Sequence, residues 1–175
     1  MSCLFTQNLI YCHDFIVGGI NQVYLANKSE ITSLTFDTGD TMMSEVQTLV
    51  PLSGQTWYEF TVLPQTVSAS EKQVNSNNGR WFFQKELSFT IDYLEPVKRS
   101  ALHELINSNN ITVVFKTNVG NWFIMGEDFG CKVSDYNATT DIMKGNNQYT
   151  IKLSTTGKYQ MRNLSTSFVE ANITV

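Results

Sequence analysis

The sequence predicts a mostly β protein with one long β-hairpin and one flanking α-helix. Segments rich in β-branched and aromatic residues recur along the 175-residue chain, divided by glycine, asparagine and proline, which is the pattern of strands and turns. Residues 66–92 form two long runs around an Asn-Asn-Gly sequence, and such a turn is typical of a hairpin. Residues 96–107 begin with proline and carry apolar side chains at helical spacing, which predicts a helix.

The strands expected before the hairpin are short. Residues 1–19 look irregular apart from a short strand at 4–11, and 41–55 are predicted to be a loop. Strands are predicted from their β-branched and aromatic content at 22–26, 31–36 and 57–63.

More short strands are expected after the helix, divided by glycine-containing turns. They are predicted at 111–116, 122–125, 131–136 and 149–153. We expect one β-rich domain over residues 1–160, since this length suits a single core. The polar residues 161–175 are predicted to form a C-terminal arm.

Charge pairing decides the register of the predicted hairpin. A two-residue turn would place Lys72 opposite Lys85 and Glu71 opposite Glu86, and directly opposed like charges destabilise a strand pair. A three-residue loop, 77–79, instead places Glu71 opposite Lys85 and leaves its glycine in the left-handed position that such loops favour. We therefore predict that paired residues have numbers summing to 156, as 71 and 85 do.

This register gives the hairpin two different faces. The polar face, which has to meet water, comprises Ser68, Ser70, Lys72, Gln84, Glu86 and Ser88. The opposite face is predicted to pack on the core or on another subunit, and comprises Val67, Ala69, Trp81, Phe83, Leu87 and Phe89. Each arm spans about ten residues, or roughly 33 Å. A long unpaired edge of this kind invites pairing with another chain.

On the helix, the apolar stripe is predicted to face the protein and the remaining side chains to face solvent. The stripe comprises Val97, Ala101, Leu102, Leu105 and Ile106. The polar side comprises Lys98, Arg99, His103 and Glu104.

The composition disfavours several classes of partner. Charged residues make up only 16% of the chain and the net charge is −4. High-affinity binding of nucleic acid needs many lysine and arginine side chains at the phosphates, and this chain has few. A surface poor in charge is also weakly protected against association. The sequence shows no signal peptide and no apolar run of about 20 residues that could span a bilayer. We expect a protein that is made in the cytosol and stays soluble.

No catalytic or metal-binding pattern is evident. His103 is expected to be a solvated helix residue, and a catalytic triad has few ways to form with His13 as the other histidine. Glu127 and Asp128 could form an acid pair, but their glycine-flanked turn predicts solvated loop residues. We therefore expect no enzyme activity.

The three cysteines are an odd number, which argues against a disulfide framework. Cys3, Cys12 and Cys131 also fit no zinc-binding spacing. We expect buried or half-buried thiols, with no metal and no cofactor. The aromatic residues, including Trp57, are expected in the core or at a subunit interface, with a sugar-stacking platform as the alternative.

The predicted pieces follow one another in a distinctive order. A one-sided hairpin precedes a single helix, an apolar strand, a Gly-Asn turn, the sequence Met125-Gly126-Glu127 and then Gly130. Residues 111–153 are similar to the pattern of an apolar strand, an Asn-Gly-like turn, Leu-Gly-x-x-x-Gly, then Asn-x-Tyr-x-Leu-x-Leu. Over residues 66–155, this order resembles the tail tube proteins of tailed bacteriophages. The opening at 12–26 is similar to small virion proteins from phages of Bacteroidetes hosts.

The resemblance implies a β-sandwich or half-barrel whose subunits form a ring of six. Long hairpins join into an inner β-barrel, and stacked rings make a tube through which DNA passes. The polar hairpin face would then line the lumen. The expected partners are other copies of the chain, other tail or neck proteins and passing DNA, with no membrane. The expected location is the virion, after synthesis in the bacterial cytoplasm.

A role as a tube terminator, a hub or a neck ring is an alternative, because Met125 replaces the commoner leucine and the 137–148 loop lacks a Ser-Gly core. A carbohydrate-binding β-sandwich is the further alternative.

Overall fold

The computed structural model describes residues 18–36, 46–51, 57–60, 65–76, 79–92, 94–140, 147–166, 169 and 173. The strands in this part of the chain are β1 Ile20–Asn27, β2 Ile31–Phe36, β3 Val46–Pro51, β4 Tyr58–Phe60, β5 Ser68–Asn75, β6 Trp81–Asp92, β7 Ile111–Thr117, β8 Trp122–Met125, β9 Lys132–Thr139, β10 Gln148–Gly157 and β11 Arg162–Leu164. One α-helix, α1 Pro96–Asn107, and a short 3-10 turn, Lys28–Glu30, complete the described elements.

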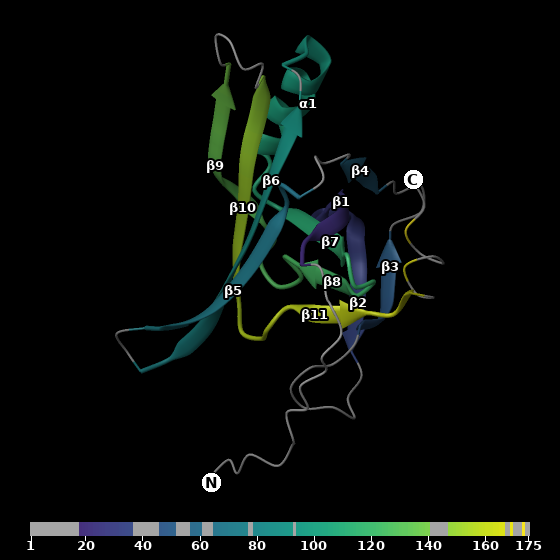
Figure 1. The fold of residues 1–175 in the computed structure, drawn as a ribbon. Helices are drawn as coiled ribbons and strands as arrows, with labels where there is room; N and C mark the ends of the chain where they lie inside the picture. Colours follow the sequence, from purple (N-terminus) through teal and green to yellow (C-terminus); the bar gives the residue numbers. More distant parts are fainter. Residues whose placement is uncertain are drawn as a thin grey trace, which may run out of the picture.

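The strands form two sheets (Figure 1). The seven-stranded sheet has the order β2-β3-β11-β8-β7-β1-β4, and the four-stranded sheet has the order β5-β6-β10-β9. All strand pairs in the smaller sheet are antiparallel. The expected mostly β fold with one flanking helix is confirmed.

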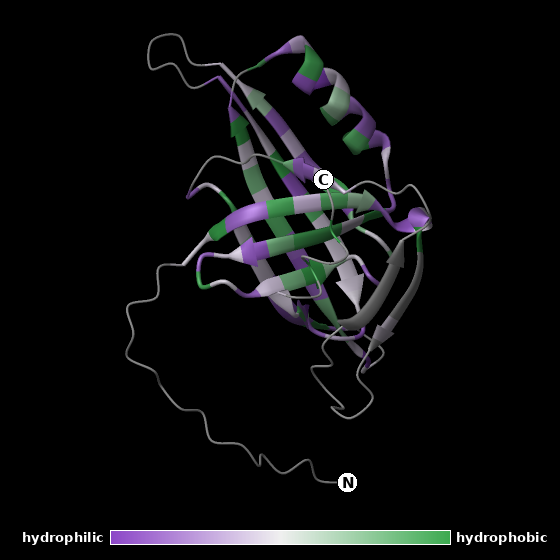
Figure 2. Ribbon diagram, turned by 90° about the vertical axis from the view of Figure 1, so that its right-hand side faces the viewer, coloured by the Kyte–Doolittle hydropathy of each residue, from purple (hydrophilic) through white to green (hydrophobic). Residues whose placement is uncertain are grey.

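The main core lies between the two sheets. The larger sheet contributes Val23, Leu25, Val113, Phe115 and Met125, and the smaller sheet contributes Leu87, Phe89, Ile151 and Leu153. In the long strands these apolar residues alternate with polar ones (Figure 2). Because of this alternation, the side chains on the other face of the four-stranded sheet point away from the core.

A second apolar cluster covers the other face of the larger sheet. It contains Trp57, Val114, Trp122, Leu164 and Val169. The expectation of a C-terminal arm from residue 161 onward is therefore wrong for this segment. Residues 162–164 pair with β8 as a sheet strand, because buried Leu164 gains apolar contacts there.

The predicted strands agree with the structure at most described positions. Besides β11, the exception is β3, which lies in the stretch 41–55 that was predicted to be a loop. Its pairing with β2 supplies hydrogen bonds that local sequence does not reveal. The predicted strand at 4–11 lies outside the described residues.

Helix α1 begins at the predicted Pro96 and ends at Asn107. Leu102 is buried and Leu105 and Ile106 are half-buried, as expected for the apolar stripe. Val97 is 80% exposed and Ala101 is also exposed, so the N-terminal half of the stripe is not covered. No helix within the described residues has the length and apolarity to cross a bilayer.

Candidate assembly surface on the four-stranded sheet

The predicted hairpin register is confirmed. Ser68 pairs with Ser88, Glu71 with Lys85, and every β5–β6 pair between them sums to 156. Gly79 has a φ of 72°, the left-handed conformation that the three-residue loop requires. The chain therefore holds two long strands in a register that keeps polar and apolar side chains apart.

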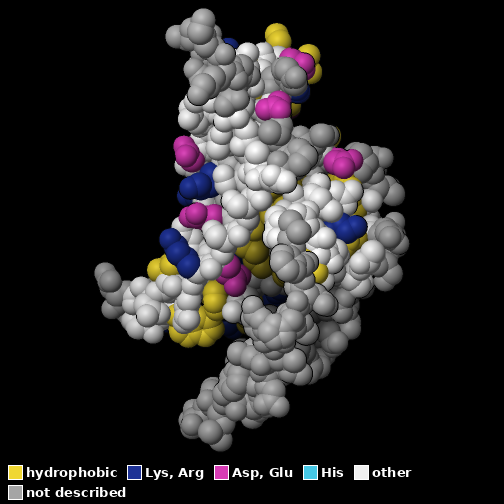
Figure 3. Space-filling view, in the orientation of Figure 1, with side chains coloured by type: hydrophobic (Ala, Val, Ile, Leu, Met, Phe, Trp, Pro, Cys, Tyr) yellow, Lys and Arg dark blue, Asp and Glu magenta, His cyan; other side chains and the backbone are white. Residues whose placement is uncertain are grey.

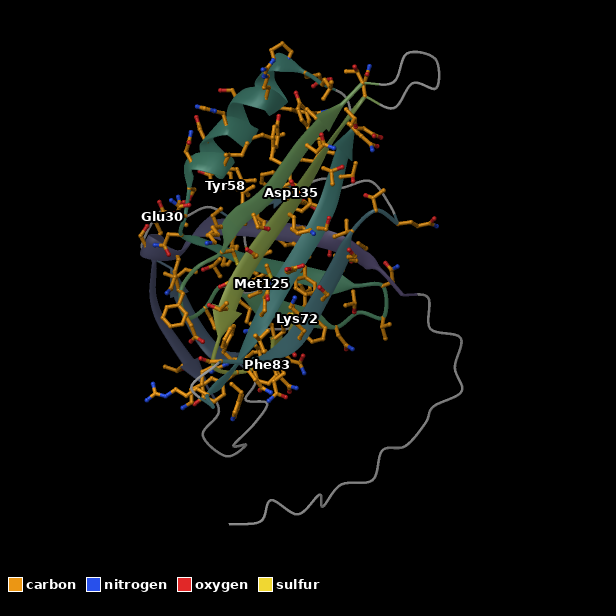
Figure 4. All side chains as sticks on the ribbon, turned by 90° about the vertical axis from the view of Figure 1, so that its left-hand side faces the viewer. Glu30, Tyr58, Lys72, Phe83, Met125 and Asp135 are labelled. Carbon is orange, nitrogen blue, oxygen red and sulfur yellow. The ribbon has the colours of Figure 1, made fainter. Side chains whose placement is uncertain are left out.

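The six predicted polar residues lie on one face, pointing away from the core. Ser68, Ser70 and Lys72 are exposed, while the three from β6 are half-buried between neighbouring strands. Figure 4 looks onto this face, which we call the outer face. Strands β10 and β9 extend it with Thr150, Lys152, Ser154, Thr156, Lys132, Asp135, Asn137 and Thr139. The β9 and β10 residues were missed, although the alternation at 148–156 carried the signal.

Charge is balanced on the outer face. Its lysines are Lys72, Lys132 and Lys152, and its carboxylates are Glu86, Asp92 and Asp135. Figure 3 shows both signs interspersed along this side of the molecule among uncharged polar surface. Such a face attracts a polyanion weakly, because equal numbers of opposite charges cancel its field at a distance.

The outer strands of this sheet, β5 and β9, both have one unpaired edge. Within the described residues, neither has a strand on its outer side. The two edges run in opposite directions, because four successive strands alternate in direction. Exposed edges of this kind are templates for pairing with another chain.

The predicted apolar face of the hairpin is divided. Val67, Leu87 and Phe89 are buried in the core, whereas Ala69 is exposed. Near the turn, Trp81 is 52% exposed and meets half-buried Phe83 edge-on, with ring centroids 5.6 Å apart. The hairpin projects beyond the two sheets (Figure 1), so the core does not reach its end.

A buried ion pair lies beneath the hairpin. Lys85 Nζ is 2.6 Å from Glu127 Oε1, and both side chains are almost fully buried. The expectation that Glu127 is a solvated loop residue is therefore wrong. Glu71 lies opposite Lys85 as predicted, but its carboxylate accepts a hydrogen bond from the Met161 N–H instead.

The turn after β8 needs both of its glycines. Gly126 has a φ of 87° and Gly130 a φ of 72°. A Cβ at Gly126 would lie 2.6 Å from the Ile111 carbonyl oxygen, and one at Gly130 would lie 2.6 Å from Asn110 Oδ1. The turn can therefore approach the chain beside β7 closely enough to place Glu127 against Lys85.

The remaining candidate site residues do not converge. His103 is exposed and its Nε2 lies 3.1 Å from Asn107 Nδ2. Cys131 is a buried free thiol, as expected, and burial together with nearby Glu127 raises its pKa. The described residues contain no cluster of three or more metal-binding side chains. Cys3, Cys12 and His13 lie outside the described residues.

The tryptophans fall into two groups. Trp57 and Trp122 are buried in the second apolar cluster, as expected for core residues. Trp81 is the exposed one, and it lies beside the hairpin turn. A sugar platform that used a tryptophan would therefore have to use Trp81.

Comparison of the chain with protein-family models, with curated protein sequences and with solved structures finds no match. The function has to be inferred from the chain's own residues and geometry.

Proposed function

We propose that this chain is a non-catalytic structural protein of a bacteriophage virion that assembles into rings, which stack into a tail tube. The observation that carries the proposal is the four-stranded sheet, with its polar outer face and two unpaired edges. A second support is the order of hairpin, helix and glycine turn along the chain, which resembles that of tail tube proteins.

The two free edges favour a closed ring. If β9 of one copy pairs with β5 of the next, the junction is antiparallel, like every pair within the sheet. This contact joins two different surfaces, so it repeats from copy to copy until the ring closes. Closure leaves no unpaired edge, which removes the risk of open-ended aggregation.

The outer face suits the wall of a DNA channel. In the ring, each copy contributes short polar side chains and equal numbers of lysines and carboxylates to the inner surface. DNA binding strengthens with each lysine or arginine that releases counterions from phosphates. A hydrated wall with balanced charge would let DNA slide past without holding it.

The aromatic residues near the hairpin turn suit contact between stacked rings. Trp81 and Phe83 lie near the end of the projecting hairpin, away from the main core. Burying such side chains against a neighbouring ring would stabilise the stack through the hydrophobic effect. A terminator, hub or neck ring would use the same ring junction without elongating.

Negative-stain electron microscopy of the purified, concentrated protein tests the proposal. We expect rings or tubes with a central hole. Closed rings that never elongate would favour the terminator, hub or neck role. A uniform small monomer at high concentration would contradict self-assembly, and exposed Trp81 would then make carbohydrate binding the reading to test on a glycan array.

Cysteine labelling tests which face lines the lumen. Ser70→Cys and Ser88→Cys lie on the outer face, and both should resist bulky thiol reagents in assembled tubes. Ser100→Cys on exposed α1 is a matched control that should stay reactive. Free labelling of Ser70→Cys and Ser88→Cys in intact tubes would contradict the lumen assignment.

A further inference from the structure

We propose that β9 of one copy pairs with β5 of the next in a single register, which places Asp135 opposite Lys72 of the neighbouring copy. This inference rests on the proposed ring and specifies its junction. The partner is a second copy of this chain, and the contact is an antiparallel strand pair.

The two edge strands match in length, and β9 has a regular stretch long enough to pair with the first five residues of β5. Strands β5 and β9 each contain eight residues. A bulge interrupts the β9–β10 pairing beyond Asp135, because Lys152 pairs with Asp135 but Leu153 pairs with Val133. Residues 135–139 of β9 can therefore pair with residues 68–72 of β5 in the next copy. In this pairing the last residue of β9 lies opposite the first residue of β5.

The pleat of the sheet reduces the number of registers. Side chains on neighbouring strands must alternate in phase, so outer-face residues have to lie opposite outer-face residues. Asp135, Asn137 and Thr139 belong to the outer face of β9, and Ser68, Ser70 and Lys72 to that of β5. The allowed registers therefore differ from one another by steps of two residues.

Charge selects one of the allowed registers. Lys72 and Asp135 are both exposed, and neither has an ion-pair partner among the described residues. Aligning the strand ends places these two charges opposite each other, and opposite charges stabilise a cross-strand pair. The same alignment places Ser70 opposite Asn137, Ala69 opposite Ala138 and Glu71 opposite Tyr136, so two bulky apolar side chains never face each other.

The neighbouring registers lose this match. A shift of two residues in one direction places Lys72 opposite Asn137 and Asp135 opposite Val74. The opposite shift places Asp135 opposite Ser70 and leaves Lys72 in the bulged part of β9. Each alternative leaves both residues without an opposite charge across the junction, and among the described residues the only opposite charge facing Asp135 is then Lys152 of its own sheet.

The selected register also fits the geometry of a closed barrel. Within one copy, a row of directly paired residues runs Ser68, Ser88, Lys152, Asp135. In the proposed junction this row continues to residue 72 of the next copy, four positions along β5 from residue 68. A stagger of about 13 Å over four strands, about 19 Å wide, corresponds to a strand tilt of about 35°, close to the usual range for barrels. A shift of two towards a smaller stagger gives only about 19°.

Disulfide crosslinking tests the register. Paired positions lie close enough for a bond after small movements, so Ser70→Cys with Asn137→Cys should give a ladder of linked copies on non-reducing gels. Within one copy, β5 and β9 are about 14 Å apart across two strands, so the bond has to join different copies. Cys3→Ser and Cys12→Ser in the same background remove two of the three native thiols, the third, Cys131, is buried, and each single variant is a control.

Two mismatched pairs make the test sharp. Ser70→Cys with Thr139→Cys reports one shifted register, and Ser70→Cys with Asp135→Cys reports the other. Rings that give a ladder only with the Ser70 and Asn137 pair support the inference. Rings that give a ladder with a mismatched pair overturn the register but leave the ring in place. If microscopy shows neither rings nor tubes, the proposed function fails together with the register.

Charge reversal supplies an independent readout. Lys72→Glu and Asp135→Lys should each raise the protein concentration at which rings form several-fold, and the double variant should assemble better than either single variant. The recovery should be partial, because Asp135→Lys also places a second positive charge opposite Lys152 of its own sheet. Losses that simply add in the double variant would overturn the pairing of these two residues.

Discussion

Lys85 and Glu127 form an ion pair that joins the long hairpin strand to the turn after β8, with 2.6 Å between Lys85 Nζ and Glu127 Oε1. The lysine interrupts the apolar face of β6 between Phe83 and Leu87. The second carboxylate oxygen, Oε2, is buried without a hydrogen-bond partner. The pair therefore links the two sheets below the projecting part of the hairpin, in a place with little tolerance for an unpaired charge.

Removing one partner of this pair should strongly destabilise the fold. Lys85→Met would leave the Glu127 charge buried and uncompensated, which typically costs about 3–5 kcal/mol. We expect a loss of this size in the free energy of unfolding, measured by urea denaturation.

The double variant Lys85→Met with Glu127→Leu is the matched control. Replacing both buried charges by apolar groups is often close to neutral, so most of the lost stability should return. A single variant that loses less than about 1 kcal/mol would contradict the pair's buried, charged state.

The hairpin could be predicted from sequence because its determinants are local. The Asn-Asn-Gly turn, the alternation and the opposed charges at Glu71 and Lys85 all lie within one continuous segment. Together they allow a single register, which the structure has. Helix α1 is similar, since its proline and its apolar spacing are neighbours in sequence.

The elements that escaped prediction depend on distant partners. Strand β3 forms against β2, and β11 against β8, from short segments without strong alternation. Lys85 and Glu127 lie 42 positions apart, and no periodicity relates them. Glu71 was the lysine's expected neighbour on the strand, whereas the turn between Gly126 and Gly130 delivers the partner that it actually has.

Gly126→Ala should be far more damaging than Gly120→Ala. Both glycines have positive φ, 87° and 98°, so alanine at either position carries backbone strain of roughly 1–2 kcal/mol. At Gly126 the new Cβ would also lie 2.6 Å from the Ile111 carbonyl oxygen, whereas nothing lies within 4 Å at Gly120.

Thermal or urea unfolding of the two variants separates strain from collision. We expect Gly120→Ala to lose about 1 kcal/mol and Gly126→Ala to lose more than about 3 kcal/mol. Equal losses would mean that backbone conformation alone explains the glycine at position 126.

Cys131 should be inert in the folded protein. The thiol is buried, and burial and the Glu127 carboxylate both raise its pKa, so it stays protonated at pH 8 while the thiolate is the reactive form. In a Cys3→Ser, Cys12→Ser background, a thiol reagent such as DTNB should not react until the protein is unfolded.

The same shift predicts a pH dependence. The folded thiol has a higher pKa than the unfolded one, so its contribution to stability is full below the unfolded pKa, near 8.5, and falls as the pH rises above it. Cys131→Ala should remove this part of the alkaline destabilisation. Val119→Cys, on an exposed turn, is the control that should react in the folded state, and equally fast reaction at Cys131 would contradict its burial.

Trp81→Ala should weaken the proposed stacking of rings without unfolding the subunit. The side chain is 52% exposed and touches Phe83 beyond the main core, so its loss costs the monomer little. In a stack, a contact of this kind would contribute about 1–2 kcal/mol, and losing it should raise the concentration needed for tubes about tenfold.

Val119→Ala is a control for losing an exposed apolar side chain elsewhere. Sedimentation and electron microscopy should show rings in place of tubes for Trp81→Ala, and tubes at the unchanged concentration for Val119→Ala. Tubes that form equally well without Trp81 would mean that the end of the hairpin does not hold the rings together.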